Sequence, residues 1–223
     1  MRALASLIDR LPGDLRDHAL THSSWTEDRA DAYERLAFLG DSVLGLAVAA
    51  EVFARFPDED AGHLTKIQNQ AVSGVSCAAV GRALGVPEML REHEPEGDGG
   101  GIAADVLLEG ERPLPEVTEA LIGACFLAYG FETSAAAVAE AFGPRIEIAS
   151  ETTIDFKSAL QEHLAQRGAR ISYEVVGEAG PPHDRIFEVA ALLGEEEVGR
   201  GSGRSKKVAE QIAAERALER LDG

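Results

Sequence analysis

The sequence has few cysteines and lacks a long apolar run. Only two cysteines, Cys77 and Cys125, occur among 223 residues, each within an apolar helical pattern. Two isolated cysteines supply neither a disulfide framework nor a zinc-ligand pattern, so a reducing cytoplasm is the expected compartment. No apolar run approaches the ~18 residues that predict a membrane span, and the N-terminus lacks the continuous apolar core of a signal peptide. We therefore expect no membrane partner.

Basic charge is scarce too. The chain carries 21 Lys/Arg against 39 Asp/Glu, a net charge of −18, which argues against a nonspecific electrostatic grip on nucleic acid. The charge is uneven, because residues 154–223 hold 10 Lys/Arg against 13 Asp/Glu, whereas residues 1–153 hold 11 against 26. A nucleic-acid partner therefore needs a local basic patch, and we expect it in the C-terminal part.

The sequence contains a series of helical patterns, followed by a part in which strand patterns also occur. After residue 151 the order becomes helix, three strands, helix, with Ser205 as the N-cap of the last helix. A Gly-, Pro- and acid-rich segment before the last long helix of the first part predicts a surface loop with a short helix near 103–108. We predict a mainly α domain over 1–150 and a small α+β domain over 151–223. Apolar residues recur at helical spacing near 3–10, 14–22, 31–56, 62–84, 115–129 and 133–142.

Two acids interrupt the otherwise apolar helix "YERLAFLGDSVLGLAVAAEVFARF". Glu34 and Asp41 share one helix face with Ala37, because a helix advances 100° per residue, and Gly45 lies one turn further on. Gly40 and Gly45 each cost about 1 kcal/mol relative to alanine inside a helix. A second backbone that approaches closely would explain why both are tolerated.

A second helix, "PLPEVTEALIGACFLAYG", offers a matching acidic face. Glu116 and Glu119 are i, i+3 neighbours, and Gly123 lies one turn further on. If the two helices cross near their glycines, the four carboxylates converge. Clustered carboxylates raise one another's pKa unless a cation lies among them, and hard oxygen ligands suit Mg²⁺ or Mn²⁺. The alternative is that these acids are solvated positions at helix ends, where the helix dipole favours a first-turn acid.

Longer stretches favour the metal-site interpretation, because they resemble a known family. "YERLAFLGDSVLGLAVA", preceded by "ALTHSSW" and followed by "TEALIGACFL", resembles the ribonuclease III family, whose helices read "NERLEFLGDSVL" and "ADxxEALIGA". The C-terminal unit, with "GRSKKxAEQ", resembles a double-stranded RNA-binding domain. The resemblance covers nearly the whole chain. It implies an all-helical endonuclease domain and an α-β-β-β-α RNA-binding domain, assembled as a homodimer.

The resemblance also implies an activity and a set of site residues. The activity is cleavage of double-stranded RNA by Mg²⁺-dependent hydrolysis, with Mn²⁺ as a substitute, leaving 5′-phosphates and short 3′ overhangs in the processing of RNA such as ribosomal precursors. Asp41 and Glu119 match the essential acids, and Glu34 matches a glutamate of the active-site surroundings. The implied metal ligands are Asp41, Glu116 and Glu119.

The sequence departs from the family at several of these positions. Ala37 stands where the family has a metal-ligand glutamate, and Glu116 stands where it has a metal-ligand aspartate. Ala61 and Gln68 replace a frequent glutamate and an arginine. A methyl group cannot ligate a metal, so a second hypothesis is a double-stranded RNA-binding dimer with weakened or absent catalysis.

The basic residues of the C-terminal unit collect in "GRGSGRSKK", which includes Arg200. Helix-start N–H groups and lysines attract phosphate, although "SKK" taken alone favours no more than the exposed start of a helix. The resemblance adds a first-helix face and a loop, as expected for a protein that spans two minor grooves of an RNA duplex. The predicted RNA-binding residues are Ser158, Gln161, Glu162, His183, Arg204, Ser205, Lys206 and Lys207.

Three other features are assigned no part in catalysis or RNA binding. We expect a structural or surface role for His22 and for His63. The aliphatic stripe of residues 43–53, with Phe53 and Phe56, is mostly core, and part of it fits the dimer seam that the family implies. Periodicity alone does not separate core from seam.

Overall fold

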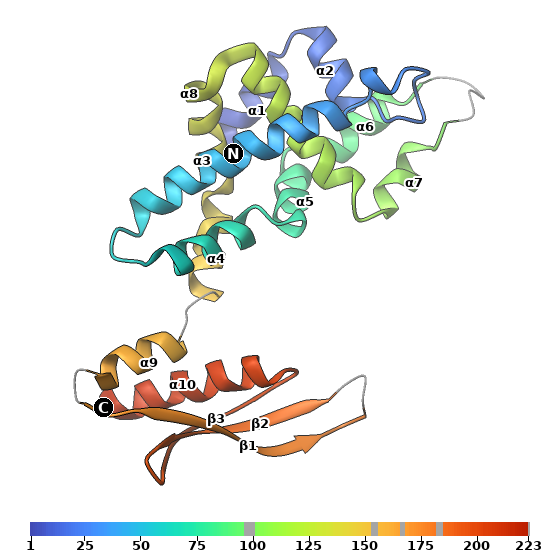
Figure 1. Ribbon diagram of the computed structural model, residues 1–223. Helices are drawn as coiled ribbons and strands as arrows, with labels where there is room; N and C mark the ends of the chain where they lie inside the picture. Colours follow the sequence, from blue (N-terminus) through green and yellow to red (C-terminus); the bar gives the residue numbers. More distant parts are fainter. Residues whose placement is uncertain (96–100, 153–155, 166–167, 182–184, 223) are drawn as a thin grey trace. The chain divides into compact units, whose positions relative to one another are not determined.

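The computed structural model describes residues 1–95, 101–152, 156–165, 168–181 and 185–222. The chain divides into two compact units, Met1–Thr153 and Ile154–Gly223. The first unit is helical and the second combines helices with one sheet (Figure 1), which confirms the predicted fold class. In the described parts of the first unit the helices are α1 Arg2–Asp9, α2 Gly13–Leu20, the short 3₁₀ helix η1 Arg29–Asp31, α3 Glu34–Arg55, α4 Ala61–Ala71, α5 Gly74–Ala83, α6 Val86–His93, α7 Ala104–Glu109 and α8 Pro113–Thr152.

Helices α3 and α8 form the centre of the first unit and pack on each other over much of their length (Figure 1). Leu44 and Val48 of α3 and Leu121 and Ile122 of α8 are fully buried. By length and composition alone, segments Arg29–Arg55 and Pro113–Thr152 are apolar enough to cross a membrane. Core helices of soluble proteins meet the same criterion, and both of these helices contribute buried residues to one hydrophobic core.

The pattern over 62–84 was wrongly predicted as one helix. Helix α4 ends at Ala71, and α5 begins with Ser73 as its N-cap. The Ser73 hydroxyl oxygen accepts the backbone N–H of Ser76 at 3.4 Å. Helix α6 was not predicted. It follows Gly85, whose φ of 78° is the left-handed conformation that glycine adopts without a steric penalty.

The segment α8 consists of two helical stretches that meet at a kink at Gly130, where φ is 78° and ψ is 172°. The sequence predicted a helix end at this glycine, and the structure has a break there. The second half was predicted over 133–142 but continues to Thr152, past Pro144. The break lets the first half of α8 carry the acidic face while the second half packs independently.

The second unit is a three-stranded antiparallel sheet in the order β1-β2-β3, with α9 and α10 packed against it. Its core includes Leu160 of α9, Val189 of β2 and Ala213 of α10. Gly199 lets α10 approach the sheet, because a Cβ at that position would lie 2.2 Å from the Ala213 carbonyl oxygen. The elements are α9 Phe156–Ala165, β1 Ile171–Ala179, β2 Ile186–Leu193, β3 Glu196–Gly203 and α10 Lys206–Asp222.

Candidate active site and RNA-binding face

The acidic residues lie where α3 and α8 cross at two glycines. A Cβ at Gly40 would lie 1.7 Å from the Glu119 carbonyl oxygen, and a Cβ at Gly123 would lie 2.3 Å from the Leu36 carbonyl oxygen. The two backbones are therefore in direct contact, as predicted for Gly40. The same expectation was wrong for Gly45 within this chain, because no described atom lies within 4 Å of a Cβ built there.

The crossing places Glu119 in an unfavourable electrostatic position. Burial raises the pKa of the Glu119 carboxyl to about 7, and the nearby charges of Asp41 and Glu116 contribute to that rise. A hydrogen bond with the Cys77 thiol acts in the opposite direction. Asp41 and Glu116 thus each lie close enough to act on the Glu119 carboxyl, so three of the four predicted acids share one neighbourhood.

Glu34 belongs to the same neighbourhood, because its charge and that of Glu116 both act on Tyr33 and His22. Burial raises the pKa of the Tyr33 hydroxyl well above its usual range, helped by the charges of Glu116 and Glu34 and by a hydrogen bond with Glu116. Burial lowers the pKa of His22, and the carboxylates of Glu34 and Glu116 counteract that shift. All four acids therefore act on one small region of the first unit.

The carboxylate oxygens of the acidic cluster suit a hard divalent cation, but the spacing of these side chains suits it less well. Among the described residues, no three His, Cys, Asp or Glu side chains gather closely enough to hold a metal ion. Ala37, on the same face as Asp41, is buried and presents only a methyl group. Asp41, Glu116 and Glu119 are nevertheless all-oxygen donors whose mutual repulsion a cation would relieve.

Two neighbours of the acidic cluster have no signal in the sequence. Cys77 is fully buried on α5, and its thiol pKa is raised to about 12 by burial and by the charges of Glu119 and Asp41. Tyr33 precedes Glu34 and belongs to no motif of its own. Both reach the cluster through long-range packing, of α5 on α8 and of the segment before α3 on α8. Local periodicity does not report such packing.

The predicted RNA-binding residues within the described part of the chain are exposed on α9 and at the start of α10. Ser205 is the N-cap of α10, because its hydroxyl oxygen accepts the backbone N–H of Val208 at 3.2 Å. The Lys206 ammonium lies 5.6 Å from the centre of the Phe187 ring. His183 lies outside the described residues. The exposed predicted residues are Ser158, Gln161 and Glu162 on α9 and Arg204, Ser205, Lys206 and Lys207 around the start of α10.

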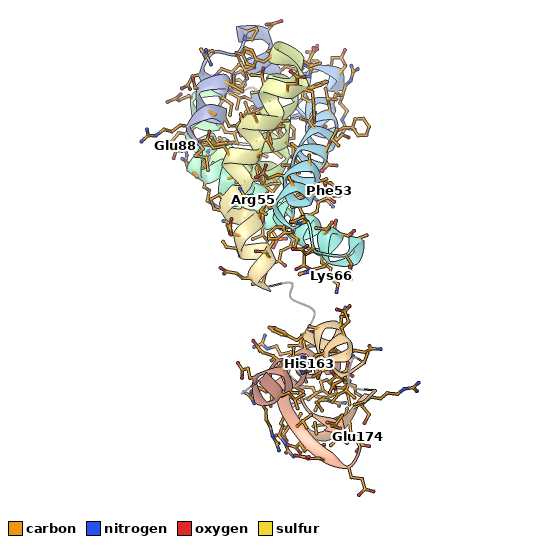
Figure 2. The ribbon with its side chains drawn as sticks, turned by 90° about the vertical axis from the view of Figure 1, so that its left-hand side faces the viewer. Phe53, Arg55, Lys66, Glu88, His163 and Glu174 are labelled. Atoms are coloured by element: carbon orange, nitrogen blue, oxygen red, sulfur yellow. The ribbon has the colours of Figure 1, made fainter. Side chains whose placement is uncertain are left out.

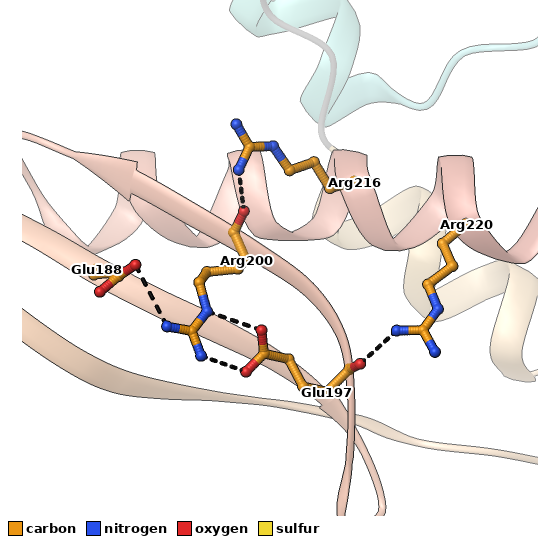
Figure 3. A network of polar contacts seen from close by, with 5 residues as sticks. All are labelled: Glu188, Glu197, Arg200, Arg216 and Arg220. Carbon is orange, nitrogen blue, oxygen red and sulfur yellow. Dashed lines mark hydrogen bonds and ion pairs between the residues drawn. The ribbon is translucent and has the colours of Figure 1, made fainter.

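Arg200 differs from the other basic residues of its segment, because acidic partners hold it (Figure 3). Its guanidinium donates two hydrogen bonds to Glu197, at 2.6 and 2.8 Å, and a longer one to Glu188 at 3.5 Å. Arg216 and Arg220 donate to the carbonyl oxygens of Arg200 and Glu197. The charge of Arg200 is thus matched locally by two carboxylates, which distinguishes it from Lys206 and Lys207 as a cation that could attract phosphate.

An all-helical domain with an acidic cluster at a helix crossing, followed by an α-β-β-β-α unit with a basic helix start, defines the class of nucleases directed at double-stranded RNA. Comparisons with known proteins agree. The family described as Ribonuclease-III-like matches residues 13–146, and the double-stranded RNA binding motif matches residues 156–221. The chain belongs to the ribonuclease III family, and it is a ribonuclease.

Relatives match along most of their length. Ribonuclease 3 of Syntrophotalea carbinolica is 37% identical over 211 residues, which are 92% of this chain and 88% of that protein. Ribonuclease 3 of Mycolicibacterium smegmatis is 37% identical over 221 residues, 95% of this chain and 93% of that one. The solved nuclease domain of Campylobacter jejuni ribonuclease III, described with a flexible region involved in dimer formation, is 28% identical. It superposes with a TM-score of 0.52 over 64% of this chain and 96% of that domain.

Proposed function

We propose that this ribonuclease is a Mg²⁺-dependent endonuclease that acts as a homodimer in the cytoplasm and cuts double-stranded RNA into products with 5′-phosphates and short 3′ overhangs. The observation that carries the proposal is the Glu119 carboxyl, whose pKa of about 7 reflects burial beside Asp41 and Glu116. A divalent cation among these carboxylates would favour the ionised form of Glu119 at neutral pH. Mn²⁺ would substitute for Mg²⁺, since both prefer oxygen ligands.

Asp41, Glu116 and Glu119 would hold the cation, which when bound activates a water molecule and stabilises charge on the phosphate. The chain's own contribution is positional. Contact between the α3 and α8 backbones at Gly40 fixes the helix that carries Asp41 against the helix that carries Glu119. Glu34 contributes negative charge at the edge of the cluster. The second unit would bring the duplex to the site through the basic start of α10.

An exposed apolar stripe on α3 supports the homodimer. Phe38, Leu46 and Phe53 are 79, 58 and 73% exposed, and helical spacing puts them on one face with Gly45 near the middle (Figure 2 labels Phe53). A hollow of about 240 Å³ beside Phe53 is lined mainly by apolar groups of α3 and α4. A second copy laid antiparallel would place the large side chains over the hollow and bring the two glycines together. That would explain a glycine at position 45, where a Cβ would meet open space in the described chain.

Cleavage of a long, perfect RNA duplex tests the activity, first with Mg²⁺ and then with Mn²⁺, beside the Asp41→Asn variant. Metal-dependent cutting into short duplexes with 5′-phosphates, abolished in the variant, is the expected result. Tight RNA binding with no cutting in either metal would instead identify a catalytically inactive RNA-binding dimer, the outcome that Ala37 would then explain.

Sedimentation of the Phe38→Asp variant tests the homodimer. We expect the wild-type chain to sediment as a dimer and the variant as a monomer, because a carboxylate would be buried in an apolar seam. Val75→Asp is the matched control, since Val75 of α5 is also 79% exposed but lies off the stripe. A wild-type monomer, or equal dissociation in both variants, would refute the proposed seam.

A further inference from the structure

Strand β3 lies at one edge of the sheet in the second unit, since the strand order is β1-β2-β3. An edge strand presents backbone N–H and C=O groups that its own sheet leaves unpaired, and these groups can pair with a strand of another molecule. At the opposite edge, the register of β1 shifts between Val175 and Gly177. A bulge of this kind twists an edge away from a regular partner, so we asked what protects β3.

Helix α10 lies directly on the backbone of β3, because alternate residues of the strand are glycines. A Cβ at Gly201 would lie 2.3 Å from the Ala209 carbonyl oxygen, and a Cβ at Gly203 would lie 2.9 Å from the Ala209 backbone nitrogen. Gly199 makes the same kind of approach further along the strand. The helix residues that face these glycines are small, fully buried and spaced four apart: Ala209, Ala213 and Ala217.

This close packing brings two arginines of α10 to the free edge of β3. Arg216 and Arg220 are four residues apart, so they lie on the same side of the helix. The Arg216 guanidinium donates to the Arg200 carbonyl oxygen at 2.8 Å, and the Arg220 guanidinium donates to the Glu197 carbonyl oxygen at 2.7 Å (Figure 3). Arg220 also forms an ion pair with Glu196 at 2.5 Å. Side chains of the chain's own helix therefore occupy two carbonyl groups of this strand.

The backbone groups of Arg200 face away from β2. In an antiparallel pair, the N–H and C=O of one residue point to the same side, and the side alternates along the strand. Arg200 lies opposite Ala190 and Ser202 lies opposite Glu188, so Arg200 and Ser202 share one orientation. Arg216, and not β2, bonds the Arg200 carbonyl oxygen, so this shared orientation is outward. The N–H groups of Arg200 and Ser202 therefore lie on the free edge as well.

We propose that Arg216 and Arg220 close a latent strand-pairing surface on β3, and that the partner this surface fits is β3 of a second copy of the chain. Paired antiparallel about Gly201, the outward groups of Arg200 in one copy would meet those of Ser202 in the other. A second copy offers the same groups in return, which makes the contact self-complementary. An incoming strand must first displace two hydrogen bonds from charged donors. The inference goes beyond the proposed function and is independent of the α3 stripe.

The test removes both donors from the full chain, in Arg216→Ala with Arg220→Ala, and measures sedimentation over a range of protein concentrations. Lys206→Ala with Lys207→Ala is the matched control, because it removes two positive charges from the same helix and keeps both edge hydrogen bonds. We expect the arginine variant to double its mass at a concentration at least about tenfold below that needed by wild type, since two hydrogen bonds correspond to about that factor. The lysine variant should sediment as wild type does.

Two further measurements identify the strand edge as the surface that pairs. Hydrogen exchange of the Arg200 backbone N–H should slow with rising concentration in the arginine variant, because pairing protects an outward donor. Adding Ser202→Pro should return this variant to the wild-type mass, since proline removes an edge N–H and leaves the bonds to β2 in place. Wild-type sedimentation of the arginine variant, or a doubled mass that persists with Ser202→Pro, would overturn the proposal.

The single variant Arg216→Ala covers the case in which the double variant fails to fold. It keeps the contacts of Arg220 with Glu197 and Glu196, and it opens the Arg200 carbonyl group alone. We expect the same slowing of Arg200 exchange at high concentration, with a melting temperature equal to that of wild type. Unchanged exchange in a folded Arg216→Ala protein would equally refute the proposal.

Discussion

Gly40 of α3 faces the carbonyl oxygen of Glu119 on α8 so closely that a methyl group on Gly40 would lie 1.7 Å from that oxygen. Neither backbone can move away without disturbing the helix to which it belongs. Main-chain contact therefore fixes the position of Glu119, whose carboxyl pKa is raised. The separation of α3 and α8 at the site depends on the absence of a side chain at Gly40.

The first prediction is that Gly40→Ala destabilises the fold. Alanine normally favours a helix interior over glycine by about 1 kcal/mol, but overlap with a backbone oxygen outweighs that preference. We expect the free energy of unfolding to fall by about 3 kcal/mol or more in denaturant titration. Gly45→Ala is the control, since open space surrounds that position in the described chain. At dilutions where the chain is monomeric, it should gain about 0.5–1 kcal/mol. Equal destabilisation in both variants would contradict the steric explanation.

The second prediction concerns pH and Glu119. Its folded pKa of about 7 lies above the ordinary 4.5, so folding favours the protonated form. The metal-free protein therefore loses stability as pH rises from the ordinary value through about 7. Glu119→Gln removes this loss, so its melting temperature should exceed that of wild type near pH 8 and equal it near pH 4. Glu132→Gln, at an exposed position of α8, serves as the control. A pH-independent difference would show that charge is not the cause.

The third prediction restores a carboxylate at Ala37. Ala37→Glu should strengthen Mg²⁺ binding and raise the cleavage rate, each by about 10–100-fold, because an additional ligand both holds and orients the cation. Without metal the variant should melt lower than wild type, since a further charge joins a crowded cluster at a buried position. Ala37→Gln controls for size without charge. If glutamate and glutamine give the same cleavage rate, the missing carboxylate at Ala37 does not limit catalysis.

The fourth prediction separates exposed from ion-paired cations in the second unit. Lys206→Ala with Lys207→Ala should weaken duplex binding regardless of sequence and reduce the salt slope by about 2, one for each phosphate that a lysine no longer neutralises. The paired change Arg200→Ala with Glu197→Ala leaves net charge unchanged and removes an ion pair. It should leave the slope unaltered. A slope reduction as large as that of the lysine variant would place Arg200 on the RNA after all.

The sequence predicted what local periodicity and charge can encode. The acidic faces of α3 and α8 and the break at Gly130 followed from helical spacing and from glycine chemistry. The division between α4 and α5 did not, because Ser73 caps a new helix inside an uninterrupted apolar pattern. The ion pair of Arg200 with Glu188 was hidden as well, since Glu188 reaches it only across the sheet.

The hydrogen bond between Gln68 and α3 provides a spectroscopic reporter of self-association. The Gln68 side-chain amide donates to the Gly45 carbonyl oxygen at 3.0 Å, near the middle of the apolar stripe. Because Gly45 has no side chain of its own, a second copy that packs there would change the magnetic environment next to this oxygen. The nuclear resonance of the Gln68 amide protons should therefore shift with protein concentration, while the amide of Gln161, on the RNA-binding unit, should stay constant.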